Sequence, residues 1–540
     1  MIVTDILVLA ALAAFVAAWW LRKLPRRPAV LLTAALVALA AGLTGAFDSR
    51  LQDAAGAAVA LVCLLVLLIN RLRRSAPRQG APFVSGTLFA LLGVAAAAAI
   101  WIFPIAPLPK PSGPYAVGVR TFELDDTARP GVFAAAAGEP RRLLVRIWYP
   151  AGDVRGRTPA PYLSAREASA AIHSRSATAG FPLKHIRTNS YADAPLRPGA
   201  KDLPVVFYSH GYTSFLAQNT VLMEHLASHG YVVVSVQHPY DSAVTVFPNG
   251  DVVGDDPALK VASAASARDE AAAEAQAQSF GGPTPGARME GFLAARERAL
   301  AQGARLQQSG IVWAADRVFV HDQLQAGAVP AAVRPIVAAA RLDRVGEMGM
   351  SFGGATAGTV CMIDRRCAAG INLDGGDFPF QAFGQPMPVP FLMFHSDLGE
   401  IVKAVTGKPA VGAPHSFNAF SYEAFAVAGT RPDVIRTQMR GARHLGLSDF
   451  SLFMRRPARD PIFGSTPTRV LIGAQNDFVM GFFDRYLLGR ANGFPQAQLA
   501  VYRDWIEPVS NTAVRDWWAT LTPDQQAAIT GRIERLRAVP

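Results

Sequence analysis

Hydrophobic positions follow two different patterns along the chain, and the change falls near residue 110. The first hundred residues hold four uncharged apolar stretches of 16 to 20 residues each. A bilayer core of about 30 Å needs roughly 20 helical residues, and backbone in lipid must satisfy its own hydrogen bonds, which a helix does. The pattern therefore predicts four transmembrane α-helices, at Ile6–Leu21, Ala29–Phe47, Ala54–Asn70 and Val84–Phe103.

The charged loops between these stretches predict their orientation. Four basic residues follow the first stretch and four follow the third, whereas Arg50 alone lies between the second and third. By the positive-inside rule the Arg-rich loops are cytoplasmic, so the N-terminus and everything after Phe103 lie outside the cytoplasmic membrane. The first stretch does not read as a cleavable signal peptide, because its positive charges follow the apolar run. Since the stretches contain no ionisable residue, we expect an anchor and favour a transporter less.

After Phe103 a proline-rich segment ends the membrane region, because its five prolines from Pro104 to Pro114 favour an extended linker. We place an anchor at residues 1–109, a catalytic domain at 110–490 and a helical tail at 491–540. Thr522-Pro-Asp-Gln525 is typical of the start of the last helix.

Short apolar runs alternate with helical segments in the second part. Strands are predicted at Leu143–Tyr149, Pro204–Ser209, Tyr231–Val236, Arg344–Gly349, Ala369–Asp374, Pro390–His395 and Ile435–Arg440, with a helix at Gln218–Ser228. This alternation indicates an α/β fold with a mostly parallel sheet and helices on both faces. Residues 255–325 lack strand signals, and predicted helices at Ala262–Ser279 and Ala287–Gln308 indicate a helical insertion or cap, or else a solvated excursion.

The composition argues against several classes of function. Apolar residues make up 51% and charged residues 17% of the chain. Of the net charge of +11, more than half belongs to residues 1–109, and the rest carries 43 basic against 38 acidic residues without a basic run. A nucleic-acid partner is therefore not expected. Three cysteines exclude a disulfide scaffold or a zinc array, and no metal or cofactor is predicted.

The chemistry centres on Ser351. Gly349-Met-Ser-Phe-Gly353 fits the G-x-S-x-G pattern between a predicted strand and a predicted helix, which is the context that a nucleophile elbow requires. The sharp turn presents the hydroxyl, and the N–H of Phe352 at the helix start is a predicted oxyanion donor. The second donor is expected in Ser209-His-Gly-Tyr212, from the N–H of Tyr212, while His210 is interpreted as structural.

A serine nucleophile needs a base and an acid, which follow it in the chain in this fold. His444 follows the last predicted strand and is the predicted base; His395 and His415 are the other downstream histidines. Asp374 and Asp397 each close a strand and either could orient the histidine, with Asp377 a weaker candidate. The pattern alone leaves Asp374 and Asp397 open. It also leaves open whether Cys361 and Cys367 form a disulfide or stay as buried thiols, while Cys63 falls in a predicted span.

Residues 112–488 resemble the plasma, or isoform II, type of the platelet-activating factor acetylhydrolase family of α/β-hydrolases. The segments that carry the resemblance include Phe207-Tyr-Ser-His-Gly211, Gly349-Met-Ser-Phe-Gly-Gly354, Gly370-Ile-Asn-Leu-Asp-Gly375 and Asn476-Asp-Phe-Val-Met-Gly-Phe-Phe-Asp484. The resemblance implies a Ser-Asp-His hydrolase of carboxylic esters that uses no metal. It selects Asp374 as the acid and places the second oxyanion donor at Tyr212.

The chain departs from the family at several points. Met350 stands where the family usually has His, Tyr212 is bulkier than the usual Leu, and the four spans are not part of the family domain. We expect a membrane-anchored serine hydrolase of short-chain acyl or phospholipid-like esters. The alternatives are a hydrolase of other esters, such as a polyester or a lactone, and an inactive sensor or scaffold on the same fold. The sequence indicates neither the acyl length nor the oligomeric state.

Overall fold

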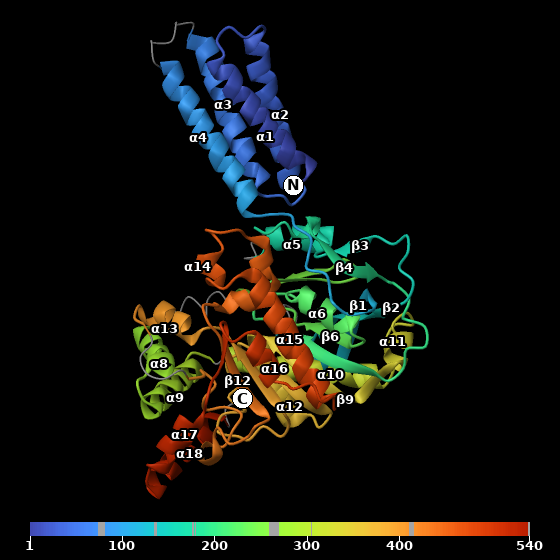
Figure 1. The fold of residues 1–540 in the computed structure, drawn as a ribbon, viewed down its shortest axis with the longest axis vertical. Coiled ribbons are helices and arrows are strands. Elements are labelled where there is room, and N and C mark those ends of the chain that lie inside the picture. Colours follow the sequence, from blue (N-terminus) through green and yellow to red (C-terminus); the bar gives the residue numbers. More distant parts are fainter. Residues whose placement is uncertain are drawn as a thin grey trace. The chain divides into compact units, whose positions relative to one another are not determined.

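Figure 1 shows the computed structural model of the chain as a ribbon. The structure describes residues 1–540 except 74–80, 134–137, 175–177, 179, 259–268, 304, 410–414 and 538–540. The chain forms two compact units, which we describe separately. The first comprises Met1–Leu108, Pro161–Arg187 and Leu452–Arg459, and the second comprises Pro109–Ala160, Thr188–Ser451 and Asp460–Pro540.

Four apolar helices run side by side in the first unit (Figure 1), namely α1 (Val3–Trp20), α2 (Arg27–Phe47), α3 (Asp53–Arg73) and α4 (Ala81–Ile102). Each is long and apolar enough to cross a membrane. Inside the bundle Phe15 stacks on Trp19, and Phe89 meets both rings edge-on. Small residues such as Ala35 and Ala38 are fully buried, which permits the close helix contacts usual in membranes. Many large apolar side chains stay exposed on the outside, Leu61 and Leu91 among them, as a surface facing lipid would have.

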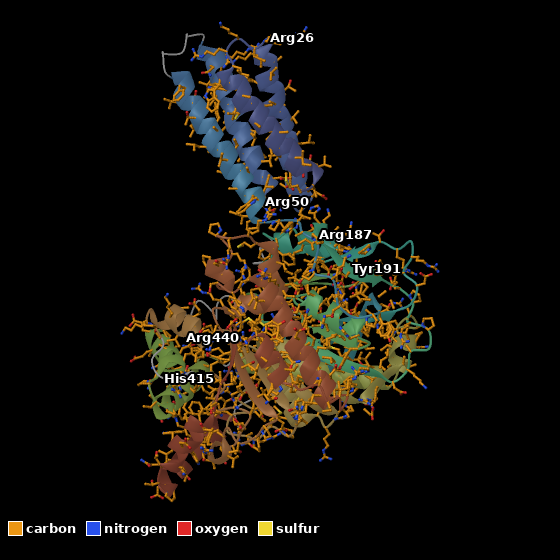
Figure 2. All side chains as sticks on the ribbon, in the orientation of Figure 1. Arg26, Arg50, Arg187, Tyr191, His415 and Arg440 are labelled. Carbon is orange, nitrogen blue, oxygen red and sulfur yellow. A yellow bond between two sulfur atoms is a disulfide. The ribbon has the colours of Figure 1, made fainter. Side chains whose placement is uncertain are left out.

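The helices begin a few residues earlier than the predicted stretches, and this brings charged residues into them. Asp5 of α1 and Asp53 of α3 are both fully buried. Arg50, also buried, donates from Nε to Asp5 Oδ1 at 2.9 Å. Figure 2 shows Arg50 at one end of the bundle and Arg26 at the opposite end. The Arg-rich first loop and the Asp5–Arg50 ion pair therefore mark opposite ends of the same bundle.

Two later segments of the chain also belong to the first unit. Residues 161–187 contain α5 (Ala165–His173) and the 3₁₀ turn η1 (Leu183–His185). Rings from both segments meet, since Phe453 lies 5.1 Å from Tyr162 and 5.9 Å from Phe181 between ring centroids, and Phe181 lies 6.0 Å from Phe103. The backbone N–H of Arg455 donates to Ile102 O at 2.8 Å. Residues 161–187 and 452–459 are thus packed on the end of α4.

The second unit is built on an eleven-stranded sheet in the order β13-β12-β11-β10-β9-β5-β6-β2-β1-β4-β3. The six strands from β12 to β6 are parallel, while β13, β2 and β1 pair antiparallel with their neighbours β12, β6 and β2. The strands are β1 (Ala116–Pro130), β2 (Pro140–Ala151), β3 (Pro159–Pro161), β4 (Arg187–Ala192), β5 (Leu203–Ser209), β6 (Val232–Gln237), β9 (Ala340–Met350), β10 (Cys367–Leu373), β11 (Phe391–His395), β12 (Val434–Met439) and β13 (Ile506–Pro508), and a separate hairpin pairs β7 (Val244–Val246) with β8 (Val252–Gly254).

Helices cover both faces of this sheet, as the sequence predicts. On one face α6 (Thr220–Ser228) and α15 (Thr468–Tyr486) bury residues such as Leu226 and Phe482 against Val206 and Ile371. On the other, α10 (Arg305–Gln325) and α11 (Arg334–Ala338) bury Val320 and Ile336 in a cluster with the alternate β5 residues Val205 and Phe207. The remaining helices are α8 (Glu270–Gly281), α9 (Pro285–Ala301), α12 (Phe352–Ile363), α13 (Leu398–Thr406), α14 (Asp460–Phe463), α16 (Gln496–Val501), α17 (Thr512–Ala519) and α18 (Pro523–Arg537).

All seven predicted strands are present, but the prediction of one helix over Ala287–Gln308 is wrong. The chain forms α9 and α10 there, and Gly303 with φ +93° separates them in a conformation that a helix does not allow. The first part of the other predicted helix, residues 262–268, lies outside the described residues. The final helix begins where predicted, with a capping box in which Gln525 N donates to Thr522 Oγ1 and Thr522 N donates to Gln525 Oε1.

Candidate active site

Ser351 lies on a tight turn between β9 and α12, with φ 55° and ψ −120°. A β-carbon on Gly353 would lie 2.0 Å from Ser209 O, and one on Gly349 would lie 2.2 Å from the Gly353 carbonyl group. Only glycine permits this approach, so the G-x-S-x-G pattern is a steric requirement of the turn. A positive φ at a serine is strained, and such strain persists where surrounding structure enforces it.

His444 and Asp374 extend a hydrogen-bonded chain from Ser351. Ser351 Oγ lies 2.9 Å from His444 Nε2, and His444 Nδ1 lies 2.6 Å from Asp374 Oδ2. Since an ionised carboxylate only accepts, Nδ1 carries the proton and Nε2 accepts from the serine hydroxyl. The histidine side chain is 42% exposed, whereas the carboxylate is fully buried. The structure therefore brings together the three residues that the sequence singles out, in the arrangement of an activated nucleophile.

The Asp374 carboxylate is held ionised by its neighbours. Burial alone would raise its pKa, but the hydrogen bond from His444 and the interactions with the nearby His395 and His444 imidazoles hold the pKa well below its usual range. Ser396 donates twice to the same group, from its backbone N to Oδ1 at 2.7 Å and from Oγ to Oδ2 at 2.6 Å. Sequence reasoning missed Ser396, although its position just after the strand that ends at His395 was a usable signal.

The other candidates for acid and base have different partners. Asp397 caps α13 by accepting from Gly399 N, and it also accepts from Gly441 N at 2.7 Å, which fixes the turn before His444. Burial raises the pKa of Asp377 to about 6, and this carboxyl accepts from Ser421 Oγ. His395 is buried, with Nε2 2.9 Å from Ser416 Oγ and Nδ1 3.7 Å from Asp374 Oδ1. His415 Nε2 lies 2.9 Å from Phe280 O. Within the described residues, no hydrogen bond joins Asp377, Asp397 or His395 to Ser351.

The predicted oxyanion donors lie beside the nucleophile. Gly211 approaches so closely that a β-carbon there would lie 3.3 Å from Ser351 Cβ. Gln218 Oε1 accepts from Gly211 N at 2.6 Å and fixes this loop. The Tyr212 and Phe352 rings are in contact, with centroids 5.0 Å apart. Phe352 opens α12, where the first N–H groups have no intrahelical acceptor. Among the described residues, no hydrogen bond uses the N–H of Tyr212 or Phe352.

A buried polar network supports the loop that carries Tyr212. His210 Nδ1 lies 2.7 Å from Gly211 O, and burial with the nearby His238 lowers the pKa of His210 to about 3. His238 stacks on Trp313 and pairs with Asp316 at 2.8 Å, and burial lowers its pKa to about 4. Both imidazoles are therefore neutral near pH 7, and His210 acts as structural support.

Cys361 near the end of α12 and Cys367 at the start of β10 form a disulfide, with Cα atoms 5.1 Å apart. The bond ties the helix behind the nucleophile to the strand that carries Asp374. Among the described residues, no three His, Cys, Asp or Glu side chains gather as metal ligands.

The central parallel strands, the strained serine at the end of β9 and the histidine after β12 define an α/β-hydrolase fold. A solved structure, the ferulic acid esterase from Streptomyces cinnamoneus, has the same fold: the TM-score is 0.52 at 21% identity, covering 75% of this chain and 99% of that one.

Residues 102–273 match the family model of platelet-activating factor acetylhydrolase, isoform II. The resemblance seen in the sequence is thereby confirmed. A relative from Arthroderma benhamiae is 26% identical over 315 residues, covers 54% of this chain and is named a probable 1-alkyl-2-acetylglycerophosphocholine esterase. The match spans 65% of that relative's length.

Proposed function

We propose that the protein is a membrane-anchored serine hydrolase that cleaves carboxylic esters. The observation that carries the proposal is the hydrogen-bonded chain Ser351–His444–Asp374, with distances of 2.9 and 2.6 Å. The similarity to a family of esterases supports the same reaction class. Ester hydrolysis needs no redox partner, so these residues and water suffice for the chemistry.

In the proposed mechanism Ser351 Oγ attacks the ester carbonyl carbon while His444 Nε2 takes the hydroxyl proton. The carbonyl oxygen becomes an oxyanion that accepts hydrogen bonds from the N–H groups of Tyr212 and Phe352. The C–O bond to the alcohol then breaks, and His444 returns its proton to the leaving alkoxide. An acyl-enzyme on Ser351 remains. Water, deprotonated by His444, attacks this acyl group, and the acid leaves as Ser351 regains its proton.

Asp374 stays ionised throughout, because its pKa lies well below neutrality. Its carboxylate fixes the Nδ1–H tautomer of His444 and stabilises the imidazolium formed at each proton transfer. Ser396 and Asp397 hold this pair in place, the first through the carboxylate and the second through the turn at Gly441.

The proposed substrates are short-chain acyl or phospholipid-like esters. Aromatic rings crowd the nucleophile, since Phe352 stacks on Phe378 with centroids 5.1 Å apart and contacts Tyr212 on another side. We infer that these rings narrow the space for the acyl group, which favours an acetyl group over a bulky one. The name of the Arthroderma relative supports the same substrate class.

We propose further that residues 1–109 anchor the chain in the cytoplasmic membrane, with residues 110–490 as the catalytic domain and 491–540 as a tail. In this topology the catalytic domain lies outside, because the Arg-rich loops face the cytoplasm. The Cys361–Cys367 disulfide supports that side, since disulfides persist in oxidising compartments.

The test is the hydrolysis of p-nitrophenyl esters from acetyl to palmitoyl by detergent-solubilised full-length protein and its Ser351→Ala variant. We expect activity highest for the shortest acyl groups and a loss of several orders of magnitude in the variant, toward the ~10⁶-fold effect of removing a triad serine. Activity that survives in a folded Ser351→Ala protein would contradict the mechanism. Serine-dependent activity that peaks at palmitoyl would contradict the substrate class alone.

A further inference from the structure

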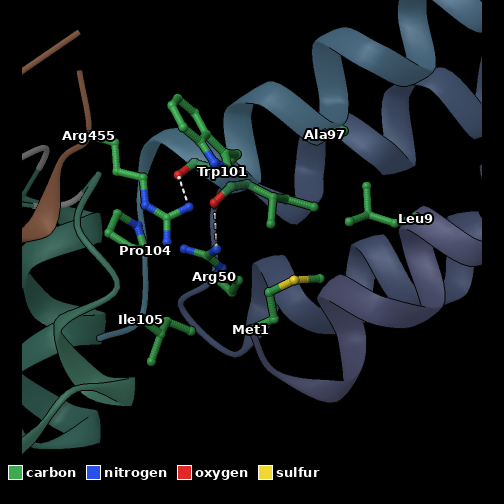
Figure 3. Close-up of a pocket in the computed structure, with 9 residues that line it drawn as sticks. Met1, Leu9, Arg50, Ala97, Trp101, Pro104, Ile105 and Arg455 are labelled. Carbon is green, nitrogen blue, oxygen red and sulfur yellow. Dashed lines mark hydrogen bonds between the residues drawn. The ribbon is translucent and has the colours of Figure 1, made fainter. Parts of the chain in front are cut away.

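A cavity of about 280 Å³ lies at the end of the helix bundle where α4 ends. Its lining includes Leu9 of α1, and Ala97 and Trp101 of α4, which Figure 3 labels, and also Ile100 of α4. The side chains of Arg50 and Arg455 bring two guanidinium groups to the lining, which also includes the N-terminal residue Met1. The cavity therefore combines an apolar wall with positive charge, inside a single compact unit of the chain.

The two arginines differ in how their donors are used. Arg50 uses four of its five N–H donors: it donates to Asp5 Oδ1, to Gln52 Oε1, and to the carbonyl oxygens of Ile100 and Phe103. These bonds neutralise its charge and close the end of α4, so Arg50 is part of the wall. A ligand at this cavity would gain little from Arg50 without breaking a buried ion pair.

The Arg455 guanidinium has N–H groups that remain available to a ligand. Its Nη1 donates to Trp101 O at 3.3 Å, and its guanidinium carbon lies 5.3 Å from the Trp101 ring centroid. Its backbone N–H donates to Ile102 O, which fixes the residue on the end of α4. Among the described residues, no group accepts from Nε or Nη2 of Arg455. The side chain is exposed and no carboxylate in that part of the chain pairs with it.

We propose that this cavity binds a phospholipid, with the lipid phosphate on Arg455 and the start of an acyl chain along Leu9, Ala97 and Ile100. A guanidinium with free N–H groups matches phosphate oxygens, and the apolar wall matches hydrocarbon. The ends of α1 and α4 lie at headgroup depth if the bundle spans a bilayer, and Trp101 is a residue type enriched at that depth. The site thus rests on the proposed membrane anchoring, and not on the proposed hydrolysis.

The volume also limits what the site can hold. It accommodates one segment of a lipid and not a whole molecule, so the acyl chains must continue along the outer surface of the bundle, where large apolar side chains such as Leu91 are exposed. Free inorganic phosphate would use Arg455 but leave the apolar wall empty, and diacylglycerol would use the wall but leave Arg455 unpaired. Binding should therefore need both parts of the ligand.

The test is native mass spectrometry of the full-length Ser351→Ala protein, which keeps any ester lipid intact, titrated in detergent with phosphatidylglycerol. We expect Arg455→Gln to weaken binding about tenfold or more, because hydrogen bonds to charged groups are strong. Ala97→Phe, which fills the cavity without changing charge, should weaken it similarly. Arg456→Gln, an equal loss of charge on the same segment outside the cavity lining, should change affinity less than about twofold.

Three results would overturn the site. Equal weakening by Arg456→Gln and Arg455→Gln would indicate general attraction to anionic lipid. Equal binding of diacylglycerol with the same chains would show that phosphate is not recognised, and displacement by inorganic phosphate at the lipid's own concentration would indicate a free-anion site. The same variants with Ser351 intact should hydrolyse p-nitrophenyl acetate normally, which shows that they fold. Carbonate extraction of membranes tests the anchoring separately: a chain released by carbonate would refute the anchor itself.

Discussion

Asp374→Asn should nearly abolish hydrolysis, although the two side chains have the same shape. In the native site Oδ1 accepts from the backbone N–H of Ser396 at 2.7 Å, and that donor cannot turn away. The oxygen of an asparagine must therefore occupy the Oδ1 position, which leaves its NH₂ group facing His444. Because two donors cannot pair, His444 must present a bare Nδ1 and move its proton to Nε2, where it can no longer accept the proton of Ser351.

The expected loss in kcat is about 10⁴-fold, the scale of this tautomer effect in serine hydrolases with a triad. KM should change little, because Asp374 is fully buried and does not reach the substrate side of the site. The assay is p-nitrophenyl acetate hydrolysis across pH 6 to 9, with circular dichroism to show that the variant is folded.

Asp397→Asn is the matched control, since Asp397 is the other strand-end carboxylate. It accepts from Gly399 N at 2.8 Å and Gly441 N at 2.7 Å, and an asparagine keeps one of these bonds. We expect a loss of about 1 kcal/mol in unfolding free energy and less than a tenfold loss in kcat, which corresponds to about 1.4 kcal/mol. If Asp397→Asn were the more damaging variant, or Asp374→Asn kept a tenth of the native rate, the assignment of the acid would be wrong.

Three further predictions follow from buried contacts. Ser396→Ala removes the 2.6 Å bond to Asp374 Oδ2 but keeps the backbone bond, so kcat should fall about tenfold with KM unchanged; a rise in KM alone would contradict a positioning role. Reduction of the Cys361–Cys367 disulfide, or its replacement by serines, should lower the unfolding free energy by about 2 kcal/mol for so short a loop, measured by urea denaturation; unchanged stability would show that the bond does not restrict the unfolded chain. Burial lowers the pKa of His238 to about 4, against about 6.5 in the unfolded chain, so its contribution to the unfolding free energy is complete above pH 6.5 and is lost as the pH falls toward 4, by about 3 kcal/mol. Thermal denaturation at several pH values should show that stability depends less on pH in His238→Gln than in the native protein. An equal pH dependence in the two proteins would refute the attribution to His238.

The sequence predicts the parallel core of the fold because the core strands are continuous apolar runs buried on two faces. Of the flanking strands, only β2 is predicted, because β1, β3, β4 and β13 carry no such apolar run. In β1 (Ala116–Pro130) buried positions are mixed with polar exposed ones and charged residues such as Asp125 and Arg120, so no apolar run marks the strand. Gly303, with its positive φ, lies at the break between α9 and α10. Helix propensity summed over a long segment does not register the backbone conformation of one residue.

The candidate site divides in a similar way. The tight turn at Ser351 requires small residues close to it in the chain, so the short G-x-S-x-G motif between a strand and a helix is sufficient to find the nucleophile. The choice between Asp374 and Asp397 depends on which carboxylate faces the histidine across two strand ends, and the residues alone left it open until the family resemblance favoured Asp374. The position of Ser396 directly after β11 is a signal in the sequence, whereas the bond from its backbone N–H does not depend on the residue type.

The central claim is that Ser351 is a nucleophile activated by His444. The most direct measurement is intact-mass and peptide mapping of the full-length protein after reaction with a fluorophosphonate, beside its His444→Ala variant. The account predicts one adduct per chain, on Ser351, and labelling slowed by orders of magnitude without His444. A native protein that stays unlabelled at Ser351, or labelling that proceeds equally fast without His444, would contradict it.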